Sequence, residues 1–158
     1  MRRGEAVKPA LPCAVVLCAL LAAIPAARAA SGADLFAAKC QACHQANGEG
    51  APGIAPPLTG TLARRAALPE GRAWLAQTLV SGLTGPITSR GEPYNGVMPP
   101  FAMLSDAELA DVAGYVLAQF NAGAAPPLPA DFAAARGRTV KPAEQRQQRT
   151  RLLAQTGE

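Results

Sequence analysis

The stretch Cys40-Gln41-Ala42-Cys43-His44 decides how the rest of the chain is interpreted. Cysteines three positions apart lie on one side of a single helical turn, so both thiols are able to add to the vinyl groups along one edge of a porphyrin. The histidine that follows directly is then placed to turn its imidazole toward the iron as an axial ligand. The C-x-x-C-H spacing is therefore typical of covalent haem attachment, with Cys40 and Cys43 as the anchors and His44 as a ligand.

A C-x-x-C pair also occurs in other kinds of site. A zinc site needs four ligands, but His44 is the only histidine, and the other cysteines, Cys13 and Cys18, lie in the N-terminal leader. A thioredoxin-like redox pair follows a strand, whereas the residues before Cys40 have a helical pattern. We therefore expect haem, with a redox dithiol or a chance match as the remaining alternatives.

Residues 1–29 have the organisation of a secretory signal peptide. A basic N-terminal segment precedes an apolar run at residues 13–24 (CAVVLCALLAAI), and Ala27-Arg28-Ala29 is an A-x-A cleavage pattern. The run is shorter than the roughly 20 apolar residues that span a bilayer, so an uncleaved anchor is less favoured. Cleavage after Ala29 predicts a periplasmic protein with no membrane span after processing.

The formal net charge of +4 is unevenly distributed along the chain. Residues 1–29 carry +3, residues 30–135 carry −3, and residues 136–158 carry +4. The basic C-terminal segment has no interleaved aromatic residue, and the chain is expected to be exported. Nucleic-acid binding is therefore not supported.

Three main helices are expected from capping residues and apolar spacing. Ser31 is a plausible N-cap of the helix that leads into the haem motif. Pro69 and Gly82 bracket a second helix over residues 69–80. Ser105 begins a capping box before a third, which ends before Gly123. Glycine permits a close helix crossing, so we expect the third helix to cross the first at Gly32 and Phe36.

Glycine and proline predict loops at residues 45–60 and 82–101. In the first loop, a backbone carbonyl near Pro56 is expected to accept the second ring N–H of His44, because metal-bound histidines usually have such a partner. In the second loop, Met98 is the favoured sixth ligand of the iron, since prolines hold it in place. Met103 competes with it, but its place beside a helix start favours packing.

Three further side chains are weaker candidates for contact with the haem. Trp74 is interpreted as a core residue that could also lie against the haem edge. Arg90 and Tyr94 are polar groups that could meet the haem propionates, and a solvated surface position is an equally good interpretation of each.

The predicted domain organisation is a signal peptide (1–29), a haem domain (30–123) and a C-terminal segment (124–158). Residues 124–131 (AAPPLPAD) are interpreted as a proline-rich linker. Beyond them the chain is polar and basic, with Pro142 as a possible helix start. A poorly ordered terminal extension is expected, and a docking strap for an acidic partner is the functional alternative.

Together these segments resemble a bacterial class I c-type cytochrome with one haem. The matching pieces are Gly32 and Phe36 before CQACH, APPLTG at 55–60, GLTGPI at 82–87, GEPYNGVMPPF at 91–101 and LSDAELADVAGYV at 104–116. The resemblance implies an all-α fold of about three main helices and long loops around one covalent haem c, attached outside the cytoplasmic membrane. It also implies a helix contact made by Gly32, Phe36, Val112 and Tyr115. In that family a proline carbonyl accepts a hydrogen bond from the haem histidine, and a methionine is the sixth ligand of the iron. The resemblance implies that Pro56 and Met98 have these roles here. The GLTGPI and YNGVMP pieces are also similar to cytochrome subunits of periplasmic dehydrogenase complexes.

The expected function is one-electron transfer rather than catalysis, since two axial ligands leave no open iron position. Redox proteins such as a dehydrogenase, an oxidase or another cytochrome are the expected partners. The chain is expected to be a monomer or a subunit of a complex. Two alternatives are kept: a tightly bound cytochrome subunit of a dehydrogenase, and a five-coordinate haem sensor or peroxidase, which requires that Met98 is not a ligand.

Overall fold

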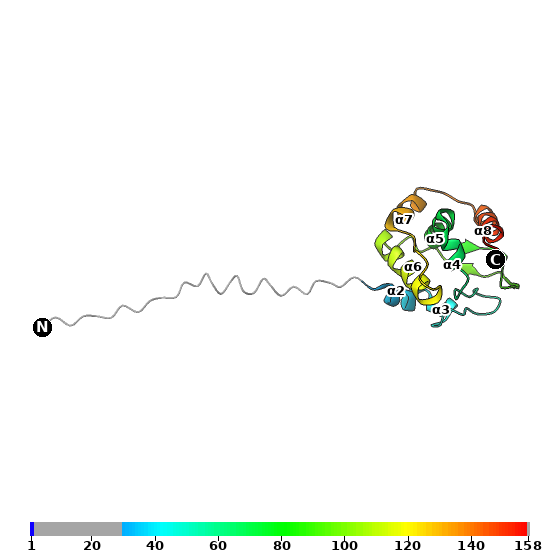
Figure 1. Ribbon diagram of the computed structural model, residues 1–158. Helices are drawn as coiled ribbons and strands as arrows, with labels where there is room; N and C mark the ends of the chain where they lie inside the picture. The colour runs from blue at the N-terminus through cyan, green and yellow to red at the C-terminus, as the bar shows by residue number, and fades with distance from the viewer. Residues whose placement is uncertain (2–29, 158) are drawn as a thin grey trace.

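The computed structural model describes Met1 and residues 30–157, and the predicted signal peptide and its cleavage pattern lie outside this part. The described chain is predominantly helical (Figure 1). Its elements in order are α2 (Gly32–Lys39), α3 (Gln41–His44), α4 (Ala63–Ala67), α5 (Pro69–Ser81), β1 (Leu83–Thr84), β2 (Ile87–Ser89), β3 (Glu92–Tyr94), β4 (Val97–Met98), α6 (Asp106–Phe120), α7 (Pro129–Arg136) and α8 (Pro142–Thr156). No helix among the described residues is both long and apolar enough to cross a membrane.

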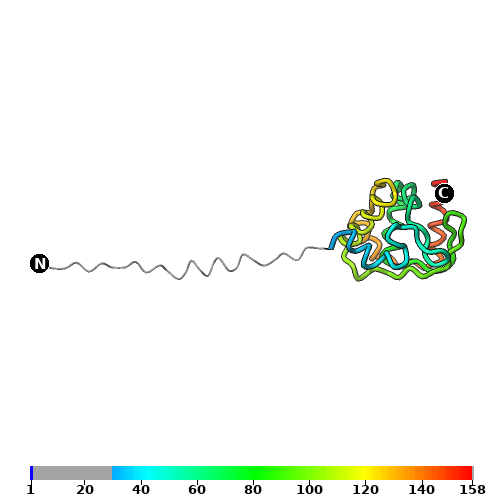
Figure 2. The backbone as a smooth tube through the Cα atoms, turned by 90° about the horizontal axis from the view of Figure 1, so that it is seen from below, coloured from blue at the N-terminus to red at the C-terminus, as the bar shows by residue number. Residues whose placement is uncertain are grey.

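Helices α2 and α6 cross closely, as the sequence predicts. Each starts with a capping box, at Ser31 and Ser105. A Cβ added to Gly32 would lie 2.2 Å from the carbonyl oxygen of Asp111 in α6, so only glycine permits this approach. The ring of Phe36 packs at 5.4 Å from the rings of both Tyr115 and Phe120. This crossing places α3, and the haem motif with it, at one end of the helical core (Figures 1 and 2).

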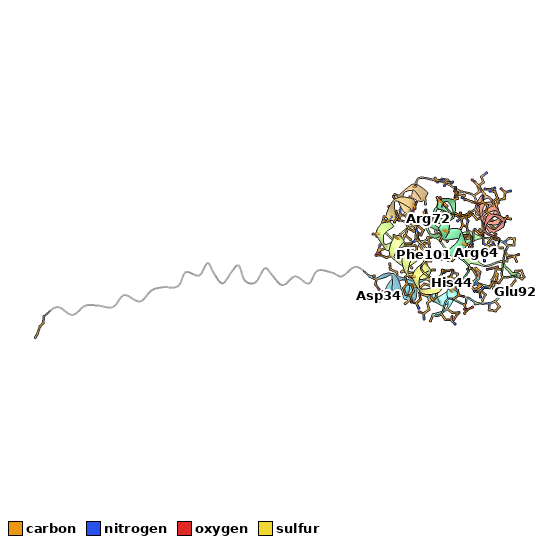
Figure 3. All side chains as sticks on the ribbon, viewed as in Figure 1. Asp34, His44, Arg64, Arg72, Glu92 and Phe101 are labelled. Carbon is orange, nitrogen blue, oxygen red and sulfur yellow. The ribbon has the colours of Figure 1, made fainter. Side chains whose placement is uncertain are left out.

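The side chains labelled in Figure 3 show which parts of this helical body are buried. Asp34 and Glu92 are exposed at its outer edges, whereas Phe101 and His44 are buried within it (Figure 3). The histidine of the haem motif therefore faces the interior of the protein.

Helix α5 confirms the second predicted helix and its stop signal. Pro69 occupies the first turn, and Gly82 caps the end with a φ of 75°. A Cβ at Gly82 would lie 2.4 Å from the carbonyl oxygen of Met98. The glycine therefore both ends the helix and lets the strand that carries Met98 pass close to it.

The segment predicted as a loop at residues 82–101 contains short strands. Strands β1 and β4 pair antiparallel, with Leu83 opposite Met98, and β2 pairs with β3, with Ile87 opposite Tyr94. The sequence pattern missed them because strands of two or three residues show no alternation to detect. Helix α4, at five residues, is likewise too short to show the repeat of apolar residues that indicates a helix. Residues 45–60 contain no helix or strand, only an isolated bridge between Ala51 and Ala55.

The expectation of a poorly ordered C-terminal extension is wrong. Helix α7 buries Phe132 completely within a cluster that includes Val80 of α5 and Leu109 of α6. Helix α8 packs against α4 and α5 and buries Leu152 (Figure 1). The polar composition was misleading because a few apolar side chains at helical spacing are enough to bury one face of a helix. Polar contacts attach the remaining residues of these helices.

Candidate functional site

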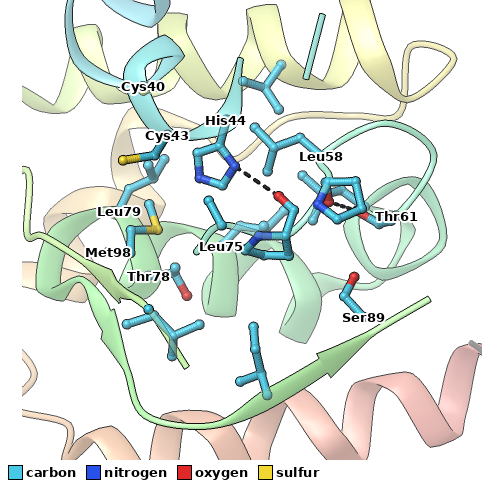
Figure 4. A pocket seen from close by; sticks show the side chains of 18 of the residues that line it. Cys40, Cys43, His44, Leu58, Thr61, Leu75, Thr78, Leu79, Ser89 and Met98 are labelled. Atoms are coloured by element: carbon cyan, nitrogen blue, oxygen red, sulfur yellow. Dashed lines mark hydrogen bonds between the residues drawn. The ribbon is translucent and has the colours of Figure 1, made fainter. Parts of the chain in front are cut away.

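A largely apolar cavity lies between the haem motif, the loop at 45–60, α5, the short strands and α6, with one residue from α8 (Figure 4). It brings together residues that are distant in sequence, including Cys43, His44 and Met98. The cationic side chains on its described wall are Lys39, Arg65 and Arg149, and no carboxylate side chain lines this wall. The cavity therefore suits a large apolar ligand that also carries negative charge.

The two cysteines of the motif lie at the edge of this cavity. Cys40 joins α2 to α3 and accepts the backbone N–H of His44 on its carbonyl at 2.9 Å. Cys40 is half-buried and Cys43 is exposed. Burial, and secondarily the neighbouring Cys43, raises the pKa of Cys40 to about 11. This thiol is therefore protonated at neutral pH and is no activated redox thiolate.

His44 is buried and oriented by the backbone of the following loop. Its Nδ1 atom lies 3.0 Å from the carbonyl oxygen of Pro56 (Figure 4). This is the hydrogen bond that the sequence analysis predicts. Burial lowers the pKa of His44, and the hydrogen bond to Pro56 opposes that shift only in part. With Nδ1–H as the donor, the neutral ring keeps the lone pair of Nε2 available for a metal.

The structure separates the two candidate methionines. Met98 is half-buried in β4 and lines the same cavity as His44 (Figure 4). Met103 lies outside the residues that line the cavity, and 73% of its surface is exposed. The position of a methionine relative to the cavity depends on the strand pairing of β4, which sequence spacing does not reveal.

The three weaker candidates for contact with the haem also differ in their position relative to the cavity. Trp74 and Tyr94 are buried and line the cavity. Arg90 does not: it is exposed, donates to the carbonyl oxygen of Thr59 and lies 3.5 Å from a carboxylate oxygen of Glu49. Its backbone has a φ of 50° in the turn between β2 and β3. The side chain therefore joins two surface loops, which agrees with the surface interpretation of Arg90, and its contact with a propionate stays a prediction.

Two buried arginines on the cavity wall were missed by the sequence analysis. Arg65 is 3% exposed; its guanidinium donates to the carbonyl oxygen of Thr61 and lies 5.5 Å from the ring centroid of Trp74. Arg149 is 6% exposed and comes from α8. Its spacing of four residues from buried Gln145 was the available signal, but it is visible only once α8 is known to pack.

Comparison with known proteins agrees with this geometry. A family model described as "Cytochrome c" matches residues 29–119. The chain is also 46% identical over 87 residues to two proteins called "Cytochrome c-552", both from Thermus thermophilus. The aligned stretch covers 55% of this chain, and 66% and 58% of those relatives, which is less than two thirds of their length.

The chain therefore belongs to the cytochrome c family and is a class I c-type cytochrome. That family carries haem c through thioethers to a C-x-x-C-H motif, as Cys40 and Cys43 would supply here. The similarity to cytochrome subunits of dehydrogenase complexes remains a prediction.

The residues of the cavity fit this group. Its apolar wall suits the porphyrin plate, a neutral imidazole nitrogen is available for the iron, and two buried guanidiniums suit the two propionate carboxylates. The fit rests on the positions of these side chains in the cavity, and it includes α8 in the site.

Proposed function

We propose that the protein is a periplasmic one-electron carrier whose haem iron has His44 and Met98 as axial ligands. When bound, haem c supplies the Fe(II)/Fe(III) couple, and a methionine ligand opposite histidine raises its reduction potential. The observation that carries the proposal is that Met98 lines the cavity into which the oriented, buried His44 faces.

The remaining side chains have distinct roles in this proposal. Cys40 and Cys43 hold the haem covalently, and the carbonyl oxygen of Pro56 keeps the His44 ring in one orientation. Arg65 and Arg149 are placed to neutralise propionates. Side chains such as Trp74 and Tyr94 exclude water from the cavity, which favours the less charged state of the iron centre and so also raises the potential.

The rim of the cavity suggests how a redox partner would dock. Ile54 and Val97 line the cavity and are 63% and 73% exposed, and Cys43, which lines the same cavity, is also exposed. An apolar rim of this kind suits a small, short-lived interface with another redox protein, such as a dehydrogenase, an oxidase or a second cytochrome. A permanent place in a dehydrogenase complex is the second candidate, and copurification with a large catalytic subunit would distinguish it.

The proposal is tested by the absorption spectrum of the protein expressed in a periplasm, oxidised and reduced, with and without carbon monoxide. We expect a sharp low-spin spectrum that carbon monoxide does not change. Met98→Ala should give a high-spin ferric spectrum and bind carbon monoxide, whereas Met103→Ala, at an exposed position, should behave as the unchanged protein. Ready binding of carbon monoxide by the unchanged protein would favour a five-coordinate sensor or peroxidase instead.

A further inference from the structure

The position of Met98 depends on a very small sheet. Strand β4 pairs with β1 through two residue pairs, Leu83 with Met98 and Thr84 with Val97. An isolated two-stranded ribbon is marginally stable in water even when it is longer than this. The place of the Met98 sulfur therefore depends on contacts from outside the ribbon, which include the packing of Met98 on the core and whatever holds β1.

Helix α8 holds β1 through one arginine. The Nη1 atom of Arg146 donates a hydrogen bond of 2.6 Å to the carbonyl oxygen of Thr84, the last residue of β1. A Cβ added to the next residue, Gly85, would lie 2.6 Å from the same nitrogen, so the guanidinium rests directly on the backbone there. A charged donor at this distance makes a strong hydrogen bond. In Figure 4 the ribbon of α8, in pale red, runs beside the strands.

The helix that carries Arg146 is itself firmly attached to α5. The indole Nε1 of Trp74 donates to the carbonyl oxygen of Gln145 at 3.0 Å, and the Gln145 side chain donates to Thr78 Oγ1 at 2.9 Å. Both hydrogen bonds are buried, so breaking them is costly. Arg146, one residue further along, therefore extends from a backbone that is held by buried hydrogen bonds to α5.

We propose that Arg146 is a positioning residue for the sixth iron ligand, because its guanidinium fixes the β1–β4 ribbon and thereby holds Met98 toward the haem iron. This inference rests on the proposed His44/Met98 ligation and adds a role for the C-terminal extension. Without Arg146 the ribbon spends more time away from the iron. An external ligand that competes with Met98 then binds more tightly.

The test is a titration of the ferric holoprotein with imidazole, followed by the loss of the sulfur-to-iron charge-transfer band at the red end of the spectrum. Arg146→Ala should bind imidazole about tenfold more tightly, the effect of losing one hydrogen bond with a charged donor. Arg146→Lys keeps the charge and a donor and should restore part of the difference. Arg151→Ala, which removes an exposed arginine of the same helix, should leave the imidazole affinity unchanged.

The outcomes separate this inference from the function on which it rests. Absence of the charge-transfer band from the unchanged protein would overturn the His44/Met98 ligation itself. A normal band with equal imidazole affinity in Arg146→Ala and the unchanged protein would overturn the positioning role alone. A lower denaturation midpoint with unchanged affinity would do the same, since it would make Arg146 merely structural. If Arg146→Ala yields no holoprotein, Arg146→Lys and Arg146→Gln carry the comparison, and unchanged affinity in both would overturn the proposal.

Discussion

The two sides of the haem cavity are built in different ways. The His44 side, residues 40–60, combines contacts within itself with contacts to the end of α6: Gly50 N–H donates to the carbonyl oxygen of His44 at 2.9 Å, and Asn121 donates to the carbonyl oxygen of Leu58 at 3.0 Å. The Met98 side, residues 82–101, depends on distant parts of the chain, such as Arg146, 62 positions beyond Thr84. The first side is therefore held by local contacts and by α6, and the second depends in addition on the C-terminal helix α8.

This difference has a consequence for how the site would fail. Proteins open locally in cooperative units, so α8 can detach while the rest of the fold persists. Its detachment removes the Arg146 contact of the Met98 side and leaves the hydrogen bonds of the His44 side to Pro56 and Asn121. We therefore expect a disturbance of the C-terminal helices to release Met98 while His44 stays bound. The predictions below test that asymmetry.

The largest effect is expected for Phe132→Ala in α7. The ring is fully buried in the cluster against which Met98 packs. Its removal should lower the free energy of unfolding by about 3–5 kcal/mol, because it leaves a cavity in the core. Denaturant unfolding followed by far-UV circular dichroism measures the loss. The ferric charge-transfer band should weaken in the folded variant, whereas a loss of His44 ligation before Met98 would contradict the comparison.

Two glycine substitutions disturb one side of the cavity each. A Cβ at Gly82 would meet the carbonyl oxygen of Met98 at 2.4 Å, and one at Gly50 would meet that of Ala55 at 2.3 Å. Both glycines have a positive φ, 75° and 72°, so alanine adds backbone strain of about 1–3 kcal/mol at either.

Because the expected backbone strain is similar at the two glycines, the spectra of the two variants should show which side of the cavity each substitution disturbs. Gly82→Ala should lose the charge-transfer band and admit imidazole readily. Gly50→Ala should keep the band and change the His44 side, seen as a shift of the imidazole proton resonances in the NMR spectrum of the holoprotein. Gly53→Ala serves as a control, since it has a similar φ of 70° but no atom within 4 Å of an added Cβ.

The smallest effect concerns Glu108, which belongs to neither side. Hydrogen bonds from the Ser105 side chain and backbone lower the pKa of this carboxyl below its ordinary value of 4.5. A carboxyl with a lowered pKa in the folded state adds stability above its unfolded pKa, and that stability is lost as pH falls through the lower folded value. Glu108→Gln should remove this dependence of stability on pH below about pH 4.5 in thermal unfolding curves. Neither iron ligand should change. A change in the charge-transfer band would show that α6 capping is coupled to Met98.

Much of the fold could be predicted from the sequence because the signals were local. The N-cap at Ser31, the capping box at Ser105 and the glycine stop at Gly82 act within one or two helical turns, and all are present in the structure. Helices α7 and α8 also begin at a proline and end at a glycine, Gly137 and Gly157, but neither has a hydroxyl or carboxamide N-cap. Their prolines are consistent with a linker as well as with a helix start, so the sequence did not settle the choice.

The candidate site also has features that follow from local sequence and features that depend on tertiary packing. The sequence by itself determined the CQACH motif. The need of a metal-bound histidine for a second hydrogen-bond partner, with the family resemblance, predicted the contact with Pro56 that the structure contains. Tertiary structure alone decided that Met98 and not Met103 lines the cavity, that Arg90 belongs to the surface, and that Arg149 reaches the cavity instead. The physical reason is that a side chain's distance from a cavity depends on strand pairing and helix packing between residues far apart in sequence, and residue type and spacing do not encode these locally.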